Sequence, residues 1–406
     1  MSIPATKIPT NSSHPFWLDQ ILTTSDQLPY QGDFDIQGLK INIHGYDPEI
    51  YLWVEKYLYP LNLSAPSNTE LSYRINFLHC DDLVLAALNT IENNEIDTRR
   101  ISNARRSLDR ICVSKQITVD CDPFYGMLWV TDRSTNSITV VLSAKVRWPF
   151  LEISRVVRDL ITRFLEDKGW ILFHAGAIQS NEKNYLVIGD ASAGKTSFII
   201  AMLYAGSAFI SNERVFVKLV DGRAKMLSFP MPIAAGLGTM VQYPELIKFI
   251  RQPQFCQYPP RRINFVKVHN TPEWKWPELE DKIQFLPQEL SRQFSDISGV
   301  PGGNIDGVIV PCRRKRQIVV LESLDKKTIG SVVTHNCIDR SHDEIYPPWM
   351  PLPFQQPSSE DIKQTISFLE NLPNSRIAFS GDKNRRNEIK TYPERIFKAL
   401  VGEYNS

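Results

Sequence analysis

Alternation of apolar and polar residues runs through the first third of the chain and predicts strands. Residues 34–43 read Phe-Asp-Ile-Gln-Gly-Leu-Lys-Ile-Asn-Ile, a period of two that is typical of a strand with one buried face. Similar stretches predict strands at 72–78, 117–119, 126–131 and 137–141, and residues 48–58 predict a helix. We therefore expect an N-terminal arm over residues 1–30, rich in Ser, Thr and Pro, and a small strand-rich α/β domain over 31–148. Substrate recognition is the role that we consider for this domain.

A longer period marks the next segment. Apolar side chains recur every three or four positions between residues 150 and 168, which predicts an amphipathic helix that ends at Gly169. We place the domain boundary just before this helix, near residue 148, so that the second domain covers 149–406.

Short apolar segments and turn residues organise the second domain. They predict strands at 170–173, 177–179, 185–188, 208–210, 214–220, 224–229, 306–310 and 318–322, and helices at 197–205, 361–369 and 392–401. Asp221-Gly222 predicts a hairpin turn. Residues 251–305, rich in Pro, Trp and Gln, have little periodicity and are expected to form a lid or insertion.

Composition limits the classes of protein that fit. In 406 residues, 46 Lys and Arg face 45 Asp and Glu, so a basic surface of the kind that binds nucleic acid is not indicated. The six cysteines have no CxxC spacing, which favours reduced thiols over a zinc ribbon or a disulfide scaffold. Without a leader-like or membrane-spanning apolar run, we expect a cytoplasmic protein that binds no membrane. The arginine doublets Arg99-Arg100 and Arg105-Arg106 are interpreted as a solvated helix face.

One motif carries specific chemistry. Gly189, Gly194, Lys195 and Thr196 complete the pattern GxxxxGK[ST], between an apolar strand and an apolar helix. In such a loop, successive backbone N–H groups and the positive end of the helix dipole face phosphate oxygens. Lys195 would pair with the β- and γ-phosphates, and the Thr196 hydroxyl would ligate Mg²⁺. The residues predicted to bind nucleotide are Gly189, Asp190, Ala191, Ser192, Ala193, Gly194, Lys195, Thr196 and Ser197.

The surroundings of this loop resemble the HPr kinase/phosphorylase family, and more distantly phosphoenolpyruvate carboxykinase, over residues 150–240. His174 matches the family's histidine before the P-loop strand, and Asp190 matches its acidic residue in the loop. Asn212 and Glu213 match the paired acids after the next strand. The resemblance implies a mixed-sheet P-loop domain with α+β character, ATP and Mg²⁺ as ligands, and a homo-oligomer. It also implies His174, Asp190, Lys195, Asn212 and Glu213 as catalytic residues, with Thr196 and Glu213 at the metal.

Asn212 departs from the family pattern. The family has an acid there that takes the proton of the acceptor hydroxyl, and an amide cannot act as a base. Glu213, Asp190 or His174 would then supply the base, or the acceptor would not need one. Asn212 can still orient an acceptor or offer its carbonyl oxygen to Mg²⁺.

Weaker candidates have simpler explanations. The basic run at 313–316 is typical of a solvated hairpin tip, and Trp274 and Trp276 favour core or lid packing over an acceptor cleft. His335, Cys337, His342 and Asp343 lack the spacing of a zinc site.

Three functions fit the pattern. The leading hypothesis is an ATP-dependent kinase that transfers the γ-phosphate to a hydroxyl of a peptide, a protein or a small metabolite. The second is a nucleotide-binding regulatory or scaffold protein without turnover, and the third is a P-loop ATPase. The sequence leaves the acceptor, ATP against GTP and the oligomeric state open.

Overall fold

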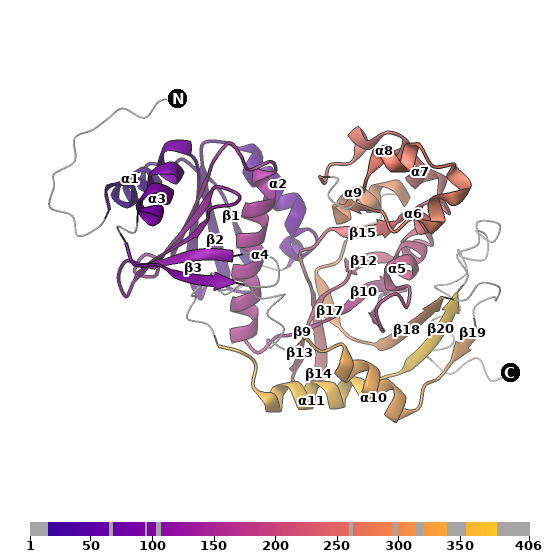
Figure 1. Cartoon of the computed structure of the whole chain (residues 1–406). Helices are drawn as coiled ribbons and strands as arrows, with labels where there is room; N and C mark the ends of the chain where they lie inside the picture. Colours follow the sequence, from indigo (N-terminus) through magenta and orange to yellow (C-terminus); the bar gives the residue numbers. More distant parts are fainter. Residues whose placement is uncertain are drawn as a thin grey trace. The chain divides into compact units, whose positions relative to one another are not determined.

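The chain forms two compact units in a computed structural model that describes residues 15–64, 68–93, 96–102, 107–259, 263–294, 299–313, 320–338 and 355–379 (Figure 1). The first unit holds the described residues of Met1–Val54 and Ser67–Leu160, and the second holds those of Glu55–Pro66, Ile161–Asp339 and Phe354–Ser406. The division falls within helix α4 (Pro149–Asp167), and not at its start near residue 148. Both units are mixtures of helices and mixed sheets, so the α+β character expected from the sequence is confirmed.

An eight-stranded sheet is the framework of the first unit, in the order β1-β2-β3-β8-β7-β6-β5-β4. The strands are β1 (Tyr30–Ile36), β2 (Leu39–Gly45), β3 (Leu71–His79), β4 (Arg99–Ser102), β5 (Ser107–Cys112), β6 (Ile117–Asp122), β7 (Met127–Asp132) and β8 (Ser137–Leu142). The helices are α1 (Phe16–Asp26), α2 (Glu49–Leu58), which continues into the second unit, and α3 (Asp81–Glu92). Strand β3 pairs in parallel with both β2 and β8, and the other neighbours are antiparallel.

Three expectations for this region differ from the structure. The stretch 34–43 is a hairpin rather than one strand, because Gln37 and Gly38 both have positive φ and turn the chain between β1 and β2. Much of the described part of the expected arm is helix α1, whose apolar side chains pack into a core cluster with α3 and β6–β8, and residues 1–14 lie outside the described residues. Arg99 and Arg100 lie on strand β4 rather than on a helix, and Arg105 and Arg106 lie outside the described residues.

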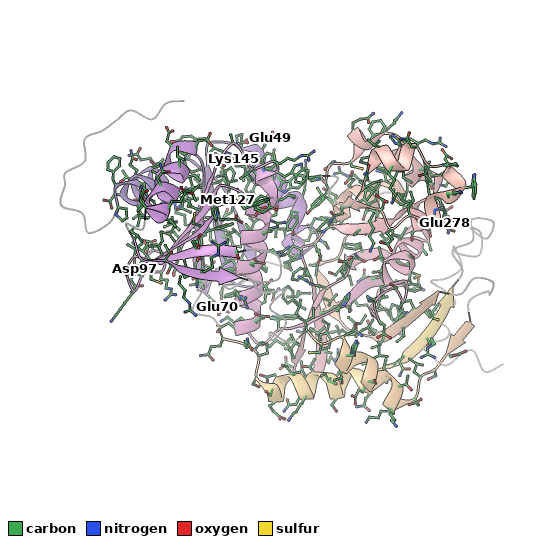
Figure 2. The ribbon with its side chains drawn as sticks, viewed as in Figure 1. Glu49, Glu70, Asp97, Met127, Lys145 and Glu278 are labelled. Atoms are coloured by element: carbon green, nitrogen blue, oxygen red, sulfur yellow. The ribbon has the colours of Figure 1, made fainter. Side chains whose placement is uncertain are left out.

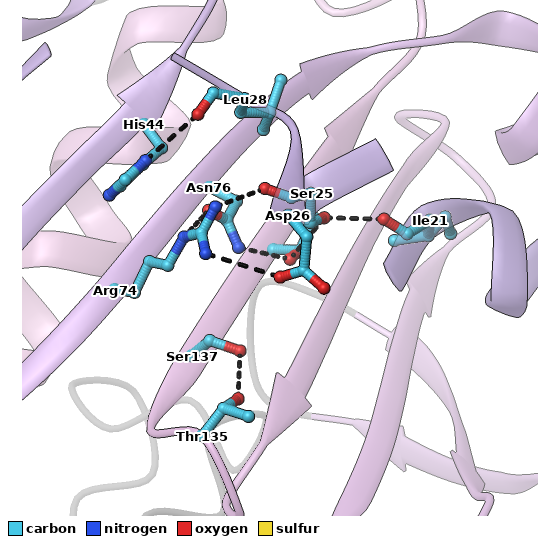
Figure 3. Close-up of polar contacts among 10 residues, drawn as sticks. Ile21, Ser25, Asp26, Leu28, His44, Arg74, Asn76, Thr135 and Ser137 are labelled. Carbon is cyan, nitrogen blue, oxygen red and sulfur yellow. Dashed lines mark hydrogen bonds and ion pairs between the residues drawn. The ribbon is translucent and has the colours of Figure 1, made fainter. Parts of the chain in front are cut away.

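Polar contacts tie the end of α1 to the sheet (Figure 3). The Arg74 guanidinium donates to the Ser25 carbonyl at 2.6 Å and to Asn76 Oδ1 at 2.9 Å. Asn76 Nδ2 in turn donates to Thr139 Oγ1, which lies 3.0 Å from Ser25 Oγ. These polar atoms satisfy one another's hydrogen-bonding capacity and hold the end of α1 against β3 and β8.

Three sheets build the second unit. A six-stranded sheet has the order β12-β10-β11-β18-β20-β19, a four-stranded sheet has the order β17-β14-β13-β9, and β15 and β16 form a two-stranded antiparallel sheet. The strands are β9 (Ile171–Phe173), β10 (Ala175–Ser180), β11 (Lys183–Ile188), β12 (Ala208–Ser211), β13 (Val215–Val220), β14 (Arg223–Ser228), β15 (Ile233–Gly236), β16 (Lys282–Phe285), β17 (Gly302–Asn304), β18 (Gly307–Arg313), β19 (Val320–Glu322) and β20 (Asn374–Phe379). The helices are α5 (Lys195–Tyr204), α6 (Leu237–Met240), α7 (Pro244–Arg251), α8 (Phe265–His269), α9 (Pro287–Ser291), α10 (Lys326–His335) and α11 (Ser359–Glu370). Short 3-10 turns are Leu61–Leu63, Pro253–Phe255, Glu273–Glu278 and Arg292–Phe294.

Strand β11 shows how the six-stranded sheet buries both faces. Tyr185 and Val187 point into a cluster with α5, whereas Leu186 and Ile188 point into a second cluster. The second cluster also holds residues of β9, β13 and β14, together with Ile329 of α10 and Leu369 of α11. Since β11 and β18 are parallel, the chain leaves both strands at the same edge of the sheet, and the P-loop follows β11 there.

Part of residues 251–305, the segment expected to form a lid or insertion, packs into the core of the second unit. Trp276, Phe285 and Leu290 belong to the cluster that covers α5, so this segment supplies core. The Trp276 residue is 3 % exposed and its indole nitrogen donates to the carbonyls of Val268 and Thr271, whereas Trp274 is 71 % exposed. Core packing of Trp276 is thus confirmed.

Most expected elements of the second unit are present within a residue or two of their predicted bounds. The turn at Asp221-Gly222 has positive φ at both residues, as a two-residue hairpin requires, and Gly169 ends α4 at φ +81°. Helix α10 and strand β20 were not predicted. The expected helix at 392–401 and most of the basic run at 313–316 lie outside the described residues.

Charged side chains gather on the surface of both units. In Figure 2 the labelled Glu49, Glu70, Asp97, Lys145 and Glu278 are exposed, and Met127 is buried. Among the described residues, no helix combines the length and the apolar character that a membrane span requires.

Candidate functional site

The GxxxxGK[ST] motif lies between β11 and α5. Three of its residues have positive φ: Gly189 at +156°, Ser192 at +67° and Gly194 at +96°. Gly194 is the N-cap of α5 in a left-handed conformation that costs glycine little. Asp190, Ala191 and Ser192 are exposed, so the loop presents its tip to solvent directly before the first turn of a helix. That first turn carries backbone N–H groups without partners inside the helix, which is the arrangement that attracts phosphate.

The Lys195 side chain lies inside the loop and binds its backbone. The residue is only 8 % exposed, and its ammonium donates to the Gly189 carbonyl at 2.6 Å and to the Asp190 carbonyl at 3.1 Å. Burial lowers the pKa of Lys195, and the negative charges of Glu213 and Asp190 oppose that shift. The predicted phosphate-binding cation therefore lies inside the curve of the loop, held by weak neutral acceptors that phosphate oxygens can replace.

The next residue meets Asn212. The Thr196 hydroxyl donates to Asn212 Oδ1 at 3.2 Å, and Asn212 itself is 1 % exposed. The Nδ2 atom of Asn212 is buried and has no hydrogen-bond partner among the described residues. The hydroxyl of Ser197, the residue after the motif, lies 2.7 Å from Thr239 Oγ1 of α6, so it contacts a neighbouring helix instead of the loop tip.

A tight turn after β12 fixes Asn212 in place. Ser211 Oγ donates to the Arg214 carbonyl at 2.5 Å, and the Arg214 amide donates to the Asn212 carbonyl at 2.8 Å. Glu213, between them, has φ +64° and is half-buried. A left-handed backbone at a residue other than glycine is uncommon and is held here by the bonds on both sides.

His174 stands at the junction of β9 and β10. Its backbone amide donates to the Asn336 carbonyl at 2.7 Å. The residue keeps solvent-exposed surface, but packing around its ring removes water, and Lys195, Arg214 and His335 add positive charge. These effects, burial first, lower the pKa of His174 to about 4. The imidazole is therefore neutral at pH 7 and can accept a proton.

The sequence did not predict that His335 lies near His174. His335 ends α10, and the following residues bridge to β9: Cys337 pairs with Phe173, and the Ile338 amide donates to the Leu172 carbonyl at 2.8 Å. That pairing brings a distant part of the chain beside His174. Nothing in the local sequence around His335 indicates it.

The donor set fits a polyphosphate better than it fits Mg²⁺. The glycine-shaped loop, the helix start and Lys195 supply donors and positive charge. The Thr196 hydroxyl, however, contacts the amide of Asn212. A Mg²⁺ site of this type needs a carboxylate at that position. Nowhere in the described part of the chain do three or more His, Cys, Asp or Glu side chains gather in a manner suited to a metal ion.

Comparisons with known proteins add little to this picture. No family model matches the chain, and no curated protein sequence matches it. Among solved structures, the HPr(Ser) kinase/phosphatase from Coxiella burnetii is similar at 10 % sequence identity and a TM-score of 0.26, covering 57 % of this chain and 98 % of that one.

Proposed function

We propose that the second unit binds a nucleoside triphosphate, ATP in the first instance, and transfers its terminal phosphoryl group to a hydroxyl of a peptide, a protein or a small metabolite. The observation that carries the proposal is the buried Lys195 inside the loop Gly189–Gly194 at the start of α5. In this reading the ammonium exchanges the carbonyls of Gly189 and Asp190 for phosphate oxygens, which are stronger acceptors because they are charged.

Phosphoryl transfer depends mainly on the positioning of the acceptor hydroxyl and the terminal phosphate, and on neutralisation of the phosphate charge. The acceptor oxygen forms a bond to the terminal phosphorus, the bond to the leaving diphosphate breaks, and the hydroxyl proton leaves the acceptor. Asn212 cannot take that proton, but the neutral imidazole of His174 can. Lys195 and Arg214 would offset the charge that develops on the phosphoryl oxygens.

The direct test compares Lys195→Ala with the wild-type chain. We expect the substitution to weaken binding of a triphosphate by about 30-fold or more, because at least one charge-assisted hydrogen bond worth about 2 kcal/mol is lost. Lys282→Ala removes an exposed lysine of β16 in the same unit and serves as the matched control. Phosphate transfer from γ-labelled ATP to candidate acceptors is measured on all three proteins. Unchanged affinity in a folded Lys195→Ala protein would show that the loop is not a phosphate site.

A second function is favoured by one observation, the amide at position 212. Without an acid beside Thr196, the unit can hold a triphosphate as a regulatory or scaffold protein that does not turn it over. This function predicts nucleotide binding that depends on Lys195 with no label transferred to any acceptor. Release of free phosphate without an acceptor would instead indicate an ATPase.

A further inference from the structure

The side chain of Asn212 offers opposite chemistry at its two ends. Its Oδ1 atom already accepts the Thr196 hydroxyl at 3.2 Å. Its Nδ2 atom is a donor, is buried, and has no hydrogen-bond partner in the residues that the structure describes. A buried donor without a partner is unfavourable until an acceptor comes within reach. A phosphate oxygen is such an acceptor, whereas a cation is repelled by the positive end of the N–H dipole.

The charges around the loop point the same way. Lys195, Arg214 and His335 are close enough to His174 for their positive charge to lower its pKa. The two nearby carboxylates, Asp190 and Glu213, already act on Lys195. A triphosphate at the loop meets the charges of Lys195 and Arg214 and the backbone N–H donors at the start of α5, which in this proposal offset its negative charge in place of a metal ion.

The hydroxyl of Thr196, with the Asn212 amide as its hydrogen-bond partner, is a poor anchor for Mg²⁺. Sites of this type hold the ion through one or two carboxylates in addition to the phosphates, because Mg²⁺ gives up its water shell reluctantly. At Asn212 the amide keeps the hydrogen bond that orients the Thr196 hydroxyl but lacks the negative charge that would attract the ion.

From these contacts we propose that Asn212 makes polyphosphate binding at this loop independent of divalent cations. The proposal rests on the triphosphate binding that is proposed above, and it names the residue that sets the cation requirement. Asn212 acts here as a binding residue through Nδ2 and as a positioning residue for Thr196 through Oδ1.

The experiment measures the dissociation constant of a non-hydrolysable triphosphate analogue in excess MgCl₂ and in EDTA, by calorimetry on the full chain. For the wild-type chain we expect less than about a threefold difference between the two conditions. For Asn212→Asp we expect binding in EDTA to be about tenfold or more weaker than in MgCl₂, because the new carboxylate repels bare phosphate and attracts the cation. Asn371→Asp, at the exposed end of α11, is the matched control and should behave as wild type.

The outcomes separate this inference from the proposed function. If the wild-type chain loses about tenfold or more of its affinity in EDTA, the cation is required and the inference is overturned, while triphosphate binding stands. If Asn212→Asp folds and responds to Mg²⁺ as the wild-type chain does, the assignment to Asn212 is overturned. Tight binding in EDTA without phosphoryl transfer supports the inference and contradicts the kinase. Absence of binding under both conditions overturns both.

Discussion

Binding of a phosphate at this loop should draw a proton onto His174. In the free protein, burial together with the charges of Lys195, Arg214 and His335 lowers the pKa of this imidazole to about 4. Phosphate oxygens bring negative charge among the same cations, which reverses the electrostatic part of the shift. The affinity for a triphosphate should therefore rise as the pH falls below about 6.5, the ordinary pKa of histidine.

The size of this effect follows from the two pKa values. If the bound complex restores the ordinary pKa of about 6.5, His174 at pH 5.5 is about nine-tenths protonated in the complex and only about 3 % protonated in the free protein. The affinity at pH 5.5 is then about tenfold higher than at pH 7.5. A bound phosphate does not reverse the burial that is the first cause of the lowered pKa, and water screens part of the interaction because His174 keeps solvent-exposed surface. About tenfold is therefore the upper limit of the effect that we expect.

Calorimetry in two buffers of different ionisation heat measures the protons taken up per triphosphate bound. The ligand's own titration contributes equally to every protein, so the comparison that matters is with His174→Asn. His269→Asn, which changes a histidine of α8 in the same unit, is the matched control. If the wild-type chain and His174→Asn take up the same number of protons at pH 5.5, the placement of His174 beside the bound phosphate is wrong.

The lowered pKa also has a consequence for stability. The folded chain resists protonation of His174 while the unfolded chain does not, so the unfolded state binds more protons between about pH 6.5 and 4. The contribution of this residue to the free energy of unfolding is therefore present above about pH 6.5 and is lost as the pH falls toward 4. A bound phosphate should reduce that loss.

Two further changes test the packing that supports the site. Burial raises the pKa of Glu289 in α9 to about 7, so the free energy of unfolding should fall by about 3 kcal/mol as the pH rises from about 4.5 to 7. Glu289→Gln should remove this fall. Hydrogen exchange of the α9 amides at each pH measures the difference. If the difference in hydrogen exchange between wild type and Glu289→Gln does not change between pH 4.5 and 7, this prediction is contradicted. Gly302→Ala should lower the free energy of unfolding by about 3 kcal/mol or more, because φ is +147° and the added Cβ would overlap the Met226 carbonyl. Thermal unfolding measures this against Gly236→Ala, where no atom lies within 4 Å of the added Cβ. Equal melting temperatures for the two variants would refute that reasoning.

Local patterns were sufficient where a single segment decides its own structure. The P-loop, α4 and the hairpin β13–β14 follow from glycine positions and from the periods of two and 3.6 residues. The hairpin at Gln37-Gly38 was missed because the alternation of apolar residues continues on both sides of the turn. Ile36 pairs with Leu39 across it, so both strands keep the same buried face, and the turn shows in the sequence only as a spacing of three residues, instead of two, between these apolar positions.

Elements that depend on distant partners were beyond local reasoning. Strand β20 is a short segment whose place in the sheet comes from parallel pairing with β18 and antiparallel pairing with β19. The position of His335 near His174 likewise comes from the bridge between Phe173 and Cys337. For the same reason the sequence could name Thr196 and Asn212 separately, but not the hydrogen bond between them.

The turn after β12 decides which residue meets Thr196. The hydrogen bond from Ser211 Oγ to the Arg214 carbonyl holds the turn. The left-handed backbone at Glu213 then directs the chain so that Asn212 contacts the Thr196 hydroxyl. A shift by one residue, which would bring the Glu213 carboxylate to that contact, would break these bonds. The residue beside the Thr196 hydroxyl is therefore a neutral amide, and in a kinase built on this loop we expect His174 to supply the base. If His174→Asn binds triphosphate but transfers no label, while the wild-type chain transfers it, this expectation is met. If both proteins bind and neither transfers label, the regulatory or scaffold function is the one that the site performs.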